Sequence, residues 1–413
     1  MKKKRLLTHL LSVALLTSPL LPVYAANQPA PAAAATSPTV SLPTAAVPIP
    51  SPSQPQLTPT VPALNANGFV LMDAASAQII ATKNPDQRMA PASLTKMMTS
   101  YIISSALKQG RIHLDDLVPI SKDAWQTGGS KMFVKVGDQV RARDLMQGII
   151  VDSGNDACVA MAEFVAGSQD AFVSLMNQQA AALGMTGTHF ADVNGLPNPN
   201  HYTTPRDMAT LARHLIYDFP EDYKWYSQKW FTYSGIKQPN RNRLLWRDAS
   251  VDGVKTGHTD EAGFCLVASA ERNGTRLISV VMGAPTDAAR ADDNEALLTY
   301  GFRFFETHKL YAANATLNKV RVYQGATETV PVGVNNDLYV VIPAGQYQNL
   351  KANLVLNTPI KAPIKKGQPL GKVNVNLNGK PLMDMSLVAL QDDPEGSLWQ
   401  RTMDRISLMF HKG

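Results

Sequence analysis

Between Gly68 and about His308, segments whose apolar residues are spaced as in a β-strand alternate with segments whose apolar residues are spaced as in a helix. Residues 68–84 contain two apolar runs around a turn of small residues, which predicts a β-hairpin. Two further β-rich runs, within residues 263–284, flank an Asn-Gly pair, which is the strongest short-range signal for a hairpin. The region therefore predicts paired antiparallel strands.

Helical periodicity appears in the same region. It covers three segments: residues 94–102, 144–167 and 170–184. The first segment begins behind Pro91, which is tolerated in a first helical turn, and the other two have glycine near their ends. Because helices and antiparallel strands alternate, we expect both to share one core within a domain of residues 65–308.

After residue 308 the pattern changes to short β-rich runs separated by Gly, Pro and Asn. This change predicts a second, all-β domain over residues 309–392. The segment has no cluster of titratable residues that would indicate chemistry of its own, so its expected role is structural or positional.

The last segment, residues 395–413, has the pattern of an amphipathic helix. At roughly 100° per residue, one side of the helical wheel carries Leu398, Trp399, Met403, Ile406, Met409 and Phe410. Basic residues and Asp404 lie opposite, and only Leu408 is out of place. Packing on the β domain is one interpretation, but a terminal helix with Trp and Phe on one face favours an interfacial membrane helix. It is too short to span a bilayer, which takes about 20 apolar residues.

The other end of the chain predicts export. Basic residues 2–5 precede a short apolar run and small residues at Val23 and Ala25, as in a secretory signal peptide over residues 1–25. Residues 26–64 contain ten prolines and no charged residue, which predicts an extended linker. Residues 2–5 also supply four of the six net positive charges, so no basic patch indicates nucleic-acid binding.

Cys158 and Cys265 are the only cysteines in the sequence. Export would permit a disulfide framework, but two cysteines do not provide one. Two buried thiols are the simplest expectation, and a single bridge stays open.

The chemistry begins with the pattern Ser-x-x-Lys, which occurs three times, as Ser93–Lys96, Ser105–Lys108 and Ser234–Lys237. The second pair lies at a helix end and the third in a turn, where lysine has ordinary surface explanations. Ser93 and Lys96 instead lie at a helix start, where residues i and i+3 are neighbours and lysine can reach the hydroxyl. Burial and the helix dipole both lower a lysine pKa there, so Lys96 is the candidate base for a Ser93 nucleophile.

Two further motifs follow in order. Ser153-Gly154-Asn155 comes sixty residues later, and Lys255-Thr256-Gly257 occurs once, followed by His258. Ser153 and Lys255 can relay a proton to a leaving amine, and Asn155 can hold a substrate backbone or orient Lys96. Gly257 lets a strand be approached closely. The backbone N–H groups of Ser93 and His258 are candidates for an oxyanion hole.

These three motifs together occur in β-lactamases and penicillin-binding proteins. Longer segments extend the match: SLTKMMTSY, GSKMFVKVGDQV, SGNDACVAMAEFVAGSQDAF, NRNRLLW, VDGVKTGHT and RLISVVMGA. From about Gly68 to Gly413 the chain resembles the low-molecular-mass penicillin-binding D-alanyl-D-alanine carboxypeptidases that a C-terminal amphipathic helix anchors.

The resemblance implies a fold of class α/β (α+β): a β-lactamase and transpeptidase-like catalytic domain with an antiparallel sheet and a helical subdomain, then a small all-β domain. It implies a serine enzyme that removes the last D-alanine from peptidoglycan pentapeptides through an acyl-enzyme, with no cofactor or metal. Penicillins would acylate it as covalent inhibitors. The expected location is the periplasmic face of the bacterial inner membrane, bound peripherally.

The resemblance also assigns residues. It implies catalytic roles for Ser93, Lys96, Ser153, Asn155 and Lys255, and substrate contacts for Thr256, Gly257, His258, Arg290 and Ser130. Arg290 matches the family's arginine near the terminal carboxylate, a group that guanidinium binds bidentately. Arg241 and Met132 match segments that border the cleft.

Several alternatives belong to the same superfamily or to another class. A β-lactamase shares the acylation step but would lack the β domain and the tail, and an endopeptidase that cuts cross-links is a closer alternative. A wall-binding scaffold with vestigial acylation is a third. A zinc peptidase is disfavoured, because the eight histidines are scattered without ligand spacing.

Overall fold

The protein is described by a computed structural model that covers residues 58–410, with side chains to Met409. The expected signal peptide, residues 26–57 of the expected linker and residues 411–413 lie outside the described residues. Residues from Pro59 onward lie along a helix of the first domain: the Tyr300 hydroxyl donates to the Pro59 carbonyl, and Val61 and Leu64 pack against buried residues.

The first domain is built on a five-stranded antiparallel sheet in the order β2-β1-β9-β8-β7. Its strands are β1 (Gly68–Asp73), β2 (Ile79–Lys83), β7 (Val251–Thr259), β8 (Gly263–Arg272) and β9 (Thr275–Ala284). Both predicted hairpins are confirmed. Asn273 and Gly274 have φ of 51° and 78°, as a two-residue hairpin turn with positive φ requires.

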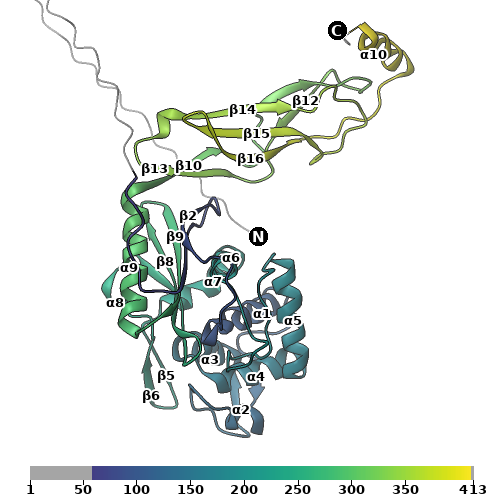
Figure 1. The fold of residues 1–413 in the computed structure, drawn as a ribbon. Helices are drawn as coiled ribbons and strands as arrows, with labels where there is room; N and C mark the ends of the chain where they lie inside the picture. Colours follow the sequence, from purple (N-terminus) through teal and green to yellow (C-terminus); the bar gives the residue numbers. More distant parts are fainter. Residues whose placement is uncertain (1–57, 411–413) are drawn as a thin grey trace, which may run out of the picture. The chain divides into compact units, whose positions relative to one another are not determined.

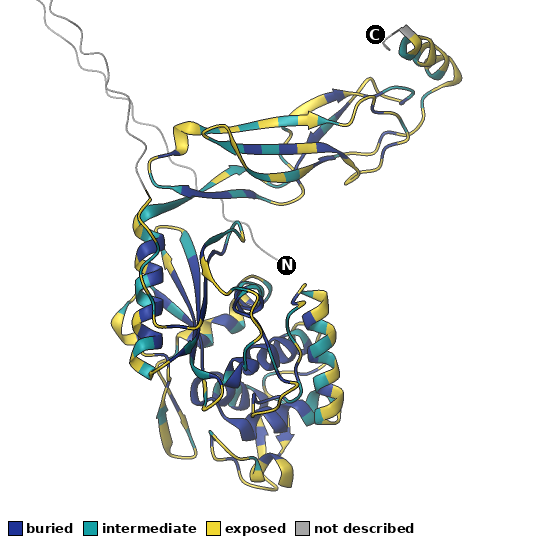
Figure 2. Ribbon diagram, viewed as in Figure 1, coloured by how far each residue is buried: buried dark blue, intermediate teal, exposed yellow. Residues whose placement is uncertain are grey.

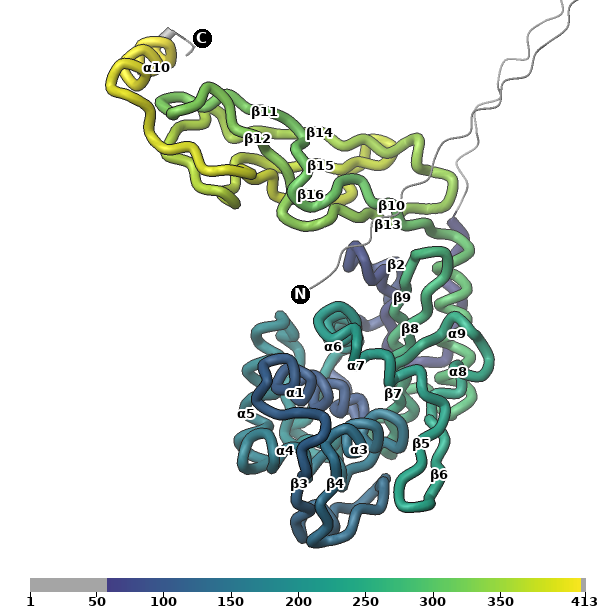
Figure 3. The backbone as a smooth tube through the Cα atoms, turned by 180° about the vertical axis from the view of Figure 1, so that it is seen from behind, coloured from purple at the N-terminus to yellow at the C-terminus, as the bar shows by residue number. Residues whose placement is uncertain are grey.

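Helices cover both faces of this sheet (Figure 1). On one face lies α9 (Asp287–Phe304); on the other lie α1 (Lys96–Lys108), α4 (Asn155–Ala166), α5 (Gln169–Ala182) and α6 (Pro205–Asp218). Seen from behind, α9 and the helical group remain on opposite sides of the strands (Figure 3). The central strands and the helix sides that face them are coloured as buried (Figure 2). Strands buried on both faces carry continuous apolar runs, as in VLM of β1 and LVA of β8.

Short elements complete this domain. They are η1 (Ala92–Thr95), β3 (Leu117–Pro119), α2 (Lys122–Gln126), β4 (Gln139–Arg141), α3 (Ala142–Gln147), η2 (Gly148–Asp152), α7 (Pro220–Tyr223), η3 (Lys224–Ser227), β5 (Trp230–Tyr233), β6 (Ile236–Pro239) and α8 (Leu244–Arg247). Strands β3 and β4 pair with each other, as do β5 and β6.

Two predicted helices differ from the structure. The segment behind Pro91 begins as the 3₁₀ turn η1, and α1 starts only at Lys96. The single helix expected over residues 144–167 is wrong, because α3 passes into a π-helical turn, η2, and Ser153 then adopts φ of 62°. Helical periodicity missed this break since residues on both sides of it are buried.

The second region contains a two-stranded ladder, β10 with β13, and a five-stranded antiparallel sheet in the order β11-β12-β16-β15-β14. The elements are β10 (Phe305–Tyr311), β11 (Asn318–Arg321), β12 (Thr329–Gly333), β13 (Leu338–Pro343), η4 (Tyr347–Asn349), β14 (Leu350–Leu356), β15 (Pro369–Leu377) and β16 (Lys380–Ala389). A core of valine, leucine and isoleucine holds these strands together. The chain then forms α10 (Leu398–Phe410).

Cys158 and Cys265 are both buried and unbridged. The expectation of two buried thiols is therefore confirmed. Burial raises the pKa of the Cys158 thiol to about 12 and that of Cys265 to about 11, so both stay protonated at neutral pH.

Phe172 tests the helical layer, because its side chain on α5 is fully buried in the core shared by α1 and α4. We expect Phe172→Ala to lower the free energy of unfolding by about 3–5 kcal/mol, since it removes apolar contacts and leaves a cavity. Urea denaturation followed by tryptophan fluorescence measures this change. The control is Leu175→Ala on the same helix, whose side chain is only partly buried; an equal loss in both variants would contradict the assigned core.

Candidate active site

Ser93 lies on the 3₁₀ turn η1, and Lys96 caps this turn as the first residue of α1. Side chains at i and i+3 eclipse in a 3₁₀ turn, so this geometry stacks the two directly. The Lys96 Nζ lies 2.9 Å from the Ser93 Oγ and donates 2.8 Å to the Asn194 carbonyl. Lys96 is only 1% exposed, whereas Ser93 is half-buried and can meet a substrate.

Burial dominates the chemistry of Lys96. It lowers the pKa of the amine from 10.5 to about 8, although the nearby Cys158 thiol and the Asp192 carboxylate act in the opposite direction. A lysine with this pKa is partly unprotonated near neutral pH. It can therefore accept a proton from a serine hydroxyl at the distance observed.

Ser153 and Lys255 form a second serine–lysine pair. The positive φ of Ser153, between η2 and α4, turns its hydroxyl toward β7, where the Lys255 Nζ lies 3.0 Å from the Ser153 Oγ. Lys255 is 4% exposed. Burial lowers its pKa well below the ordinary value, and the positive charges of Lys96, Arg241 and Arg290 lower it further. The two pairs therefore share one electrostatic environment.

Gly257 brings the strand of the third motif against the turn of the first. A Cβ at this position would lie 2.9 Å from the Pro91 carbonyl oxygen and 3.2 Å from the Leu94 nitrogen. Only a residue without a side chain allows β7 to lie this close to η1. The sequence reasoning expected this glycine to admit a substrate strand, and the structure adds that it admits the nucleophile's own turn.

Asn155 and Asp156 hold the loop before β4. The Asn155 side chain donates 2.6 Å to the Gly128 carbonyl, and its backbone N–H donates to the Ser130 carbonyl. Asp156 accepts backbone N–H groups from residues 132–134. The Asn155 amide thus has a loop partner rather than Lys96, and its contact with substrate stays a prediction.

Arg290 lies at the start of α9 and is 6% exposed. Its guanidinium donates 2.9 Å to the Gly257 carbonyl and 3.2 Å to the Cys265 carbonyl, and it also pairs with Asp287. These contacts place a cation directly behind the strand of the third motif. Its role toward a substrate carboxylate stays a prediction.

The remaining candidate residues differ in their burial and in their distance from the two serine–lysine pairs. Thr256 is buried on β7, His258 is exposed one residue beyond Gly257, and Ser130 is half-buried on the loop that Asn155 holds. The other two Ser-x-x-Lys patterns lie elsewhere: Lys108 donates to the Asp218 carbonyl, and Lys237 lies over the Trp230 ring.

Sequence reasoning missed three residues that contact the site. Asp156 directly follows the second motif and could have been found as a buried carboxylate that needs partners. Asp192 and Asn194 lie on the loop between α5 and α6. Asn194 acts through its backbone carbonyl, for which side-chain patterns give no signal.

A half-buried serine beside a buried amine, a second serine–lysine pair and a glycine-bearing edge strand define a serine acyl-transfer enzyme of the penicillin-binding type. Comparison with known proteins agrees. The family pattern described as D-alanyl-D-alanine carboxypeptidase matches residues 55–286, and that of the penicillin-binding protein 5 C-terminal domain matches residues 305–395. The chain belongs to the D-alanyl-D-alanine carboxypeptidase family.

Relatives match over most of their length. D-alanyl-D-alanine carboxypeptidase DacC of Escherichia coli is 47% identical over 86% of this chain and 91% of its own. The crystal structure of penicillin binding protein 5 from Haemophilus influenzae has a TM-score of 0.79 and 46% identity, covering 81% of this chain and 99% of that one. Penicillin-binding protein D2 from Listeria monocytogenes, in its ampicillin-bound form, has a TM-score of 0.54 and 31% identity, covering 58% of this chain and 98% of that one. The predicted fold class and serine D-Ala-D-Ala carboxypeptidase activity are confirmed.

The pH dependence of acylation tests the role of Lys96. The base is the unprotonated amine, so the rate should fall as the pH drops through about 8 and decrease about tenfold per unit below it. Acylation by a fluorescent penicillin, measured between about pH 5 and pH 10, gives this profile. Thermal unfolding over the same range is the control, and a midpoint at the ordinary lysine pKa would contradict the role of burial.

Proposed function

We propose that Ser93 is the acylated nucleophile and Lys96 its general base. The observation that carries the proposal is a pair of neighbouring contacts, Lys96 with Ser93 at 2.9 Å and Lys255 with Ser153 at 3.0 Å. The Ser93–Lys96 pair attacks the substrate carbonyl, and the Ser153–Lys255 pair protonates the leaving amine.

The steps follow from these positions. The Ser93 Oγ attacks the carbonyl of the penultimate D-alanine and its proton passes to the Lys96 amine. The C–N bond then breaks, and the Ser153 hydroxyl donates a proton to the leaving D-alanine. The proton that Lys96 took from Ser93 replaces it by way of the Lys255 amine, so both amines end uncharged. Water hydrolyses the ester and frees Ser93. Arg290 and the β7 strand hold the terminal carboxylate and the peptide backbone.

We further propose that the substrate is the peptidoglycan stem pentapeptide ending in D-Ala-D-Ala, and that β-lactams acylate the same serine. The location is the periplasmic face of the inner membrane. The predicted signal peptide over residues 1–25 and the similarity to penicillin-binding proteins support this location.

The proposed membrane contact is the apolar face of α10. Leu398, Trp399 and Met409 are 76%, 73% and 75% exposed. Among the described residues, no helix has the length and apolar content needed to cross a membrane. An amphipathic helix lying in the interface does not need that length.

The opposite face of α10 supports this orientation. Asp404 accepts the backbone N–H of Gln324 and lies 3.7 Å from Arg321, so a charged residue faces the β domain. Leu408, the one misplaced residue of the predicted apolar face, lines a pocket of that domain with Val320 and Ile360. Asp404 and Leu408 thus face the β domain, while large apolar side chains at both ends of α10 stay exposed and available to lipid.

Ser93→Ala tests the nucleophile. We expect D-alanine release from a D-Ala-D-Ala pentapeptide to fall by at least about 10³-fold and covalent penicillin labelling to disappear, because within residues 58–409 the Lys96 amine is hydrogen-bonded to no other hydroxyl. Amino-acid analysis and mass spectrometry of the penicillin adduct measure the two effects. A cross-linked dimer assayed in parallel reports any endopeptidase activity.

The matched control for this change is Ser105→Ala, which removes the serine of another Ser-x-x-Lys pair on the same helix. It should keep both activities. Penicillin labelling that persists in Ser93→Ala would remove Ser93 from the proposed role.

The membrane helix is tested by the double change Trp399→Ser and Met409→Ser. Each large apolar side chain contributes about 1.5–3 kcal/mol when buried, so binding to anionic vesicles should weaken by at least about tenfold. Vesicle co-sedimentation measures it. The control is the double change Leu117→Ser and Val136→Ser, at residues that are 57% and 53% exposed on the first domain. Equal weakening of vesicle binding in both double variants would contradict α10 as the membrane contact.

A further inference from the structure

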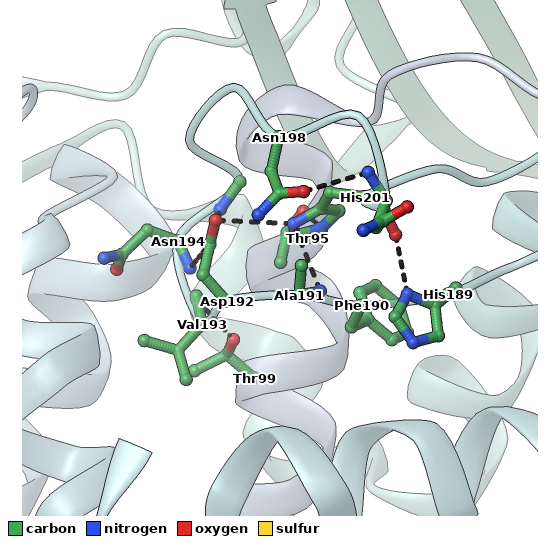
Figure 4. Close-up of polar contacts among 12 residues, drawn as sticks. Thr95, Thr99, His189, Phe190, Ala191, Asp192, Val193, Asn194, Asn198 and His201 are labelled. Carbon is green, nitrogen blue, oxygen red and sulfur yellow. Dashed lines mark hydrogen bonds and ion pairs between the residues drawn. The ribbon is translucent and has the colours of Figure 1, made fainter. Parts of the chain in front are cut away.

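The loop between α5 and α6 carries a carboxylate that faces the start of α1. Figure 4 shows Asp192, Asn194 and His201 on this loop, with Thr95 and Thr99 reaching toward it from the helix. The Asp192 Oδ1 accepts two backbone N–H groups, from Asn194 and from Gly195, each at 2.6 Å. The carboxylate therefore closes a tight turn of the loop.

One peptide unit joins this carboxylate to the catalytic amine. The N–H of Gly195 and the carbonyl of Asn194 belong to the same planar peptide, in which they point in opposite directions. The N–H donates to Asp192, and the carbonyl accepts from the Lys96 Nζ at 2.8 Å. A negative charge on the N–H side polarises the peptide and makes its carbonyl a stronger acceptor.

The loop is held at this distance by Gly195. Its φ is 85°, and a Cβ there would lie 1.8 Å from the Ala92 carbonyl oxygen. The Thr99 hydroxyl also donates 2.7 Å to the Val193 carbonyl. The peptide is thus packed directly against the turn that carries Ser93, and a bulkier residue would displace it.

His201 lies beside the other oxygen of the carboxylate. Its Nδ1 lies 3.4 Å from the Asp192 Oδ2 and 3.4 Å from the Ala191 nitrogen, and its Nε2 lies 2.8 Å from the Thr95 Oγ1. Burial raises the pKa of Asp192, but His201 and the two backbone N–H groups outweigh it and hold the pKa below its usual value. Asp192 therefore carries a negative charge at neutral pH.

We propose that Asp192 is a positioning residue for Lys96, which it orients and strengthens as a base through the Asn194–Gly195 peptide. The proposal rests on the role of Lys96 proposed above. Lys96 without this carbonyl would keep only Ser93 as a fixed partner, and its amine could rotate away from the hydroxyl. The charge of Asp192 also favours the ammonium that forms when Lys96 takes the proton.

Other groups act on the same amine. Besides Asp192, they are Cys158 and Asp156 on α4, and Arg241, whose positive charge acts in the opposite direction. Burial keeps Cys158 protonated, and Asp156 is already bound to three loop N–H groups. Asp192 differs from both because a single peptide connects it to the Lys96 Nζ.

The variant Asp192→Asn tests the negative charge of Asp192 separately from its role in closing the loop turn. The amide oxygen can still accept both backbone N–H groups, so the loop is kept while the negative charge is lost. In the profile of penicillin acylation rate against pH, the acidic limb is the part where the rate falls as the pH drops. We expect this limb to move to lower pH by about 0.5–1 unit, because a positive charge on Lys96 is no longer favoured. The plateau rate above the limb should fall, since the amine is a weaker base.

The matched control is Asp207→Asn. Asp207 is also a buried carboxylate, and its Oδ2 accepts from the Gly187 N–H and the Thr188 hydroxyl at the base of the same loop. The variant Asp207→Asn should lower thermal stability without moving the acidic limb of the acylation profile. Asp192→Ser, a second neutral residue that can close the turn, replaces Asp192→Asn if that variant does not fold.

The outcomes separate the two proposals. An acidic limb that is unchanged in both neutral Asp192 variants overturns the positioning role and leaves Lys96 as the base. Undiminished acylation in Lys96→Ala overturns the role of Lys96 itself. A limb that moves in Asp192→Asn and stays in Asp207→Asn supports the positioning role, because a purely structural carboxylate would not shift it.

Discussion

Two neighbouring lysine amines are buried, and each lies against a serine hydroxyl. A buried ammonium is costly unless it is paired, so desolvation favours the uncharged form that can accept a proton. The surrounding structure serves this arrangement. The 3₁₀ turn stacks Lys96 on Ser93, the left-handed Ser153 meets Lys255, and Gly257 and Gly195 allow a strand and a loop to lie against the nucleophile's turn.

The cost of burial is limited by backbone acceptors. The Asn194 carbonyl accepts from Lys96 and the Thr256 carbonyl accepts from Lys255, so neither amine depends on its serine alone. Carbonyl groups orient an amine without abolishing its basicity, whereas a carboxylate in direct contact would hold it charged. Placing Asp192 one peptide away gives an intermediate effect, and we regard this as the reason for the elaborate loop turn.

The second region and α10 differ from the first domain in what they bury and what they expose. The β domain has its own core of mostly branched aliphatic residues. Helix α10 buries one leucine and a charged residue against this domain while its large apolar side chains stay exposed. The serine–lysine pairs and the proposed membrane contact therefore lie in separate parts of one chain.

The sequence by itself determined much of this protein. Apolar, β-rich runs around a turn of small residues and around an Asn-Gly pair predicted the two hairpins of the sheet, because turn chemistry acts locally. The three motifs predicted the reacting groups, since each needs a particular side chain. Only the tertiary structure decided the 3₁₀ start of α1, the break at Ser153 and the contacts of Asp156, Asp192 and Asn194. These depend on backbone groups brought together from distant segments, and a backbone carbonyl has no signature in the sequence of side chains.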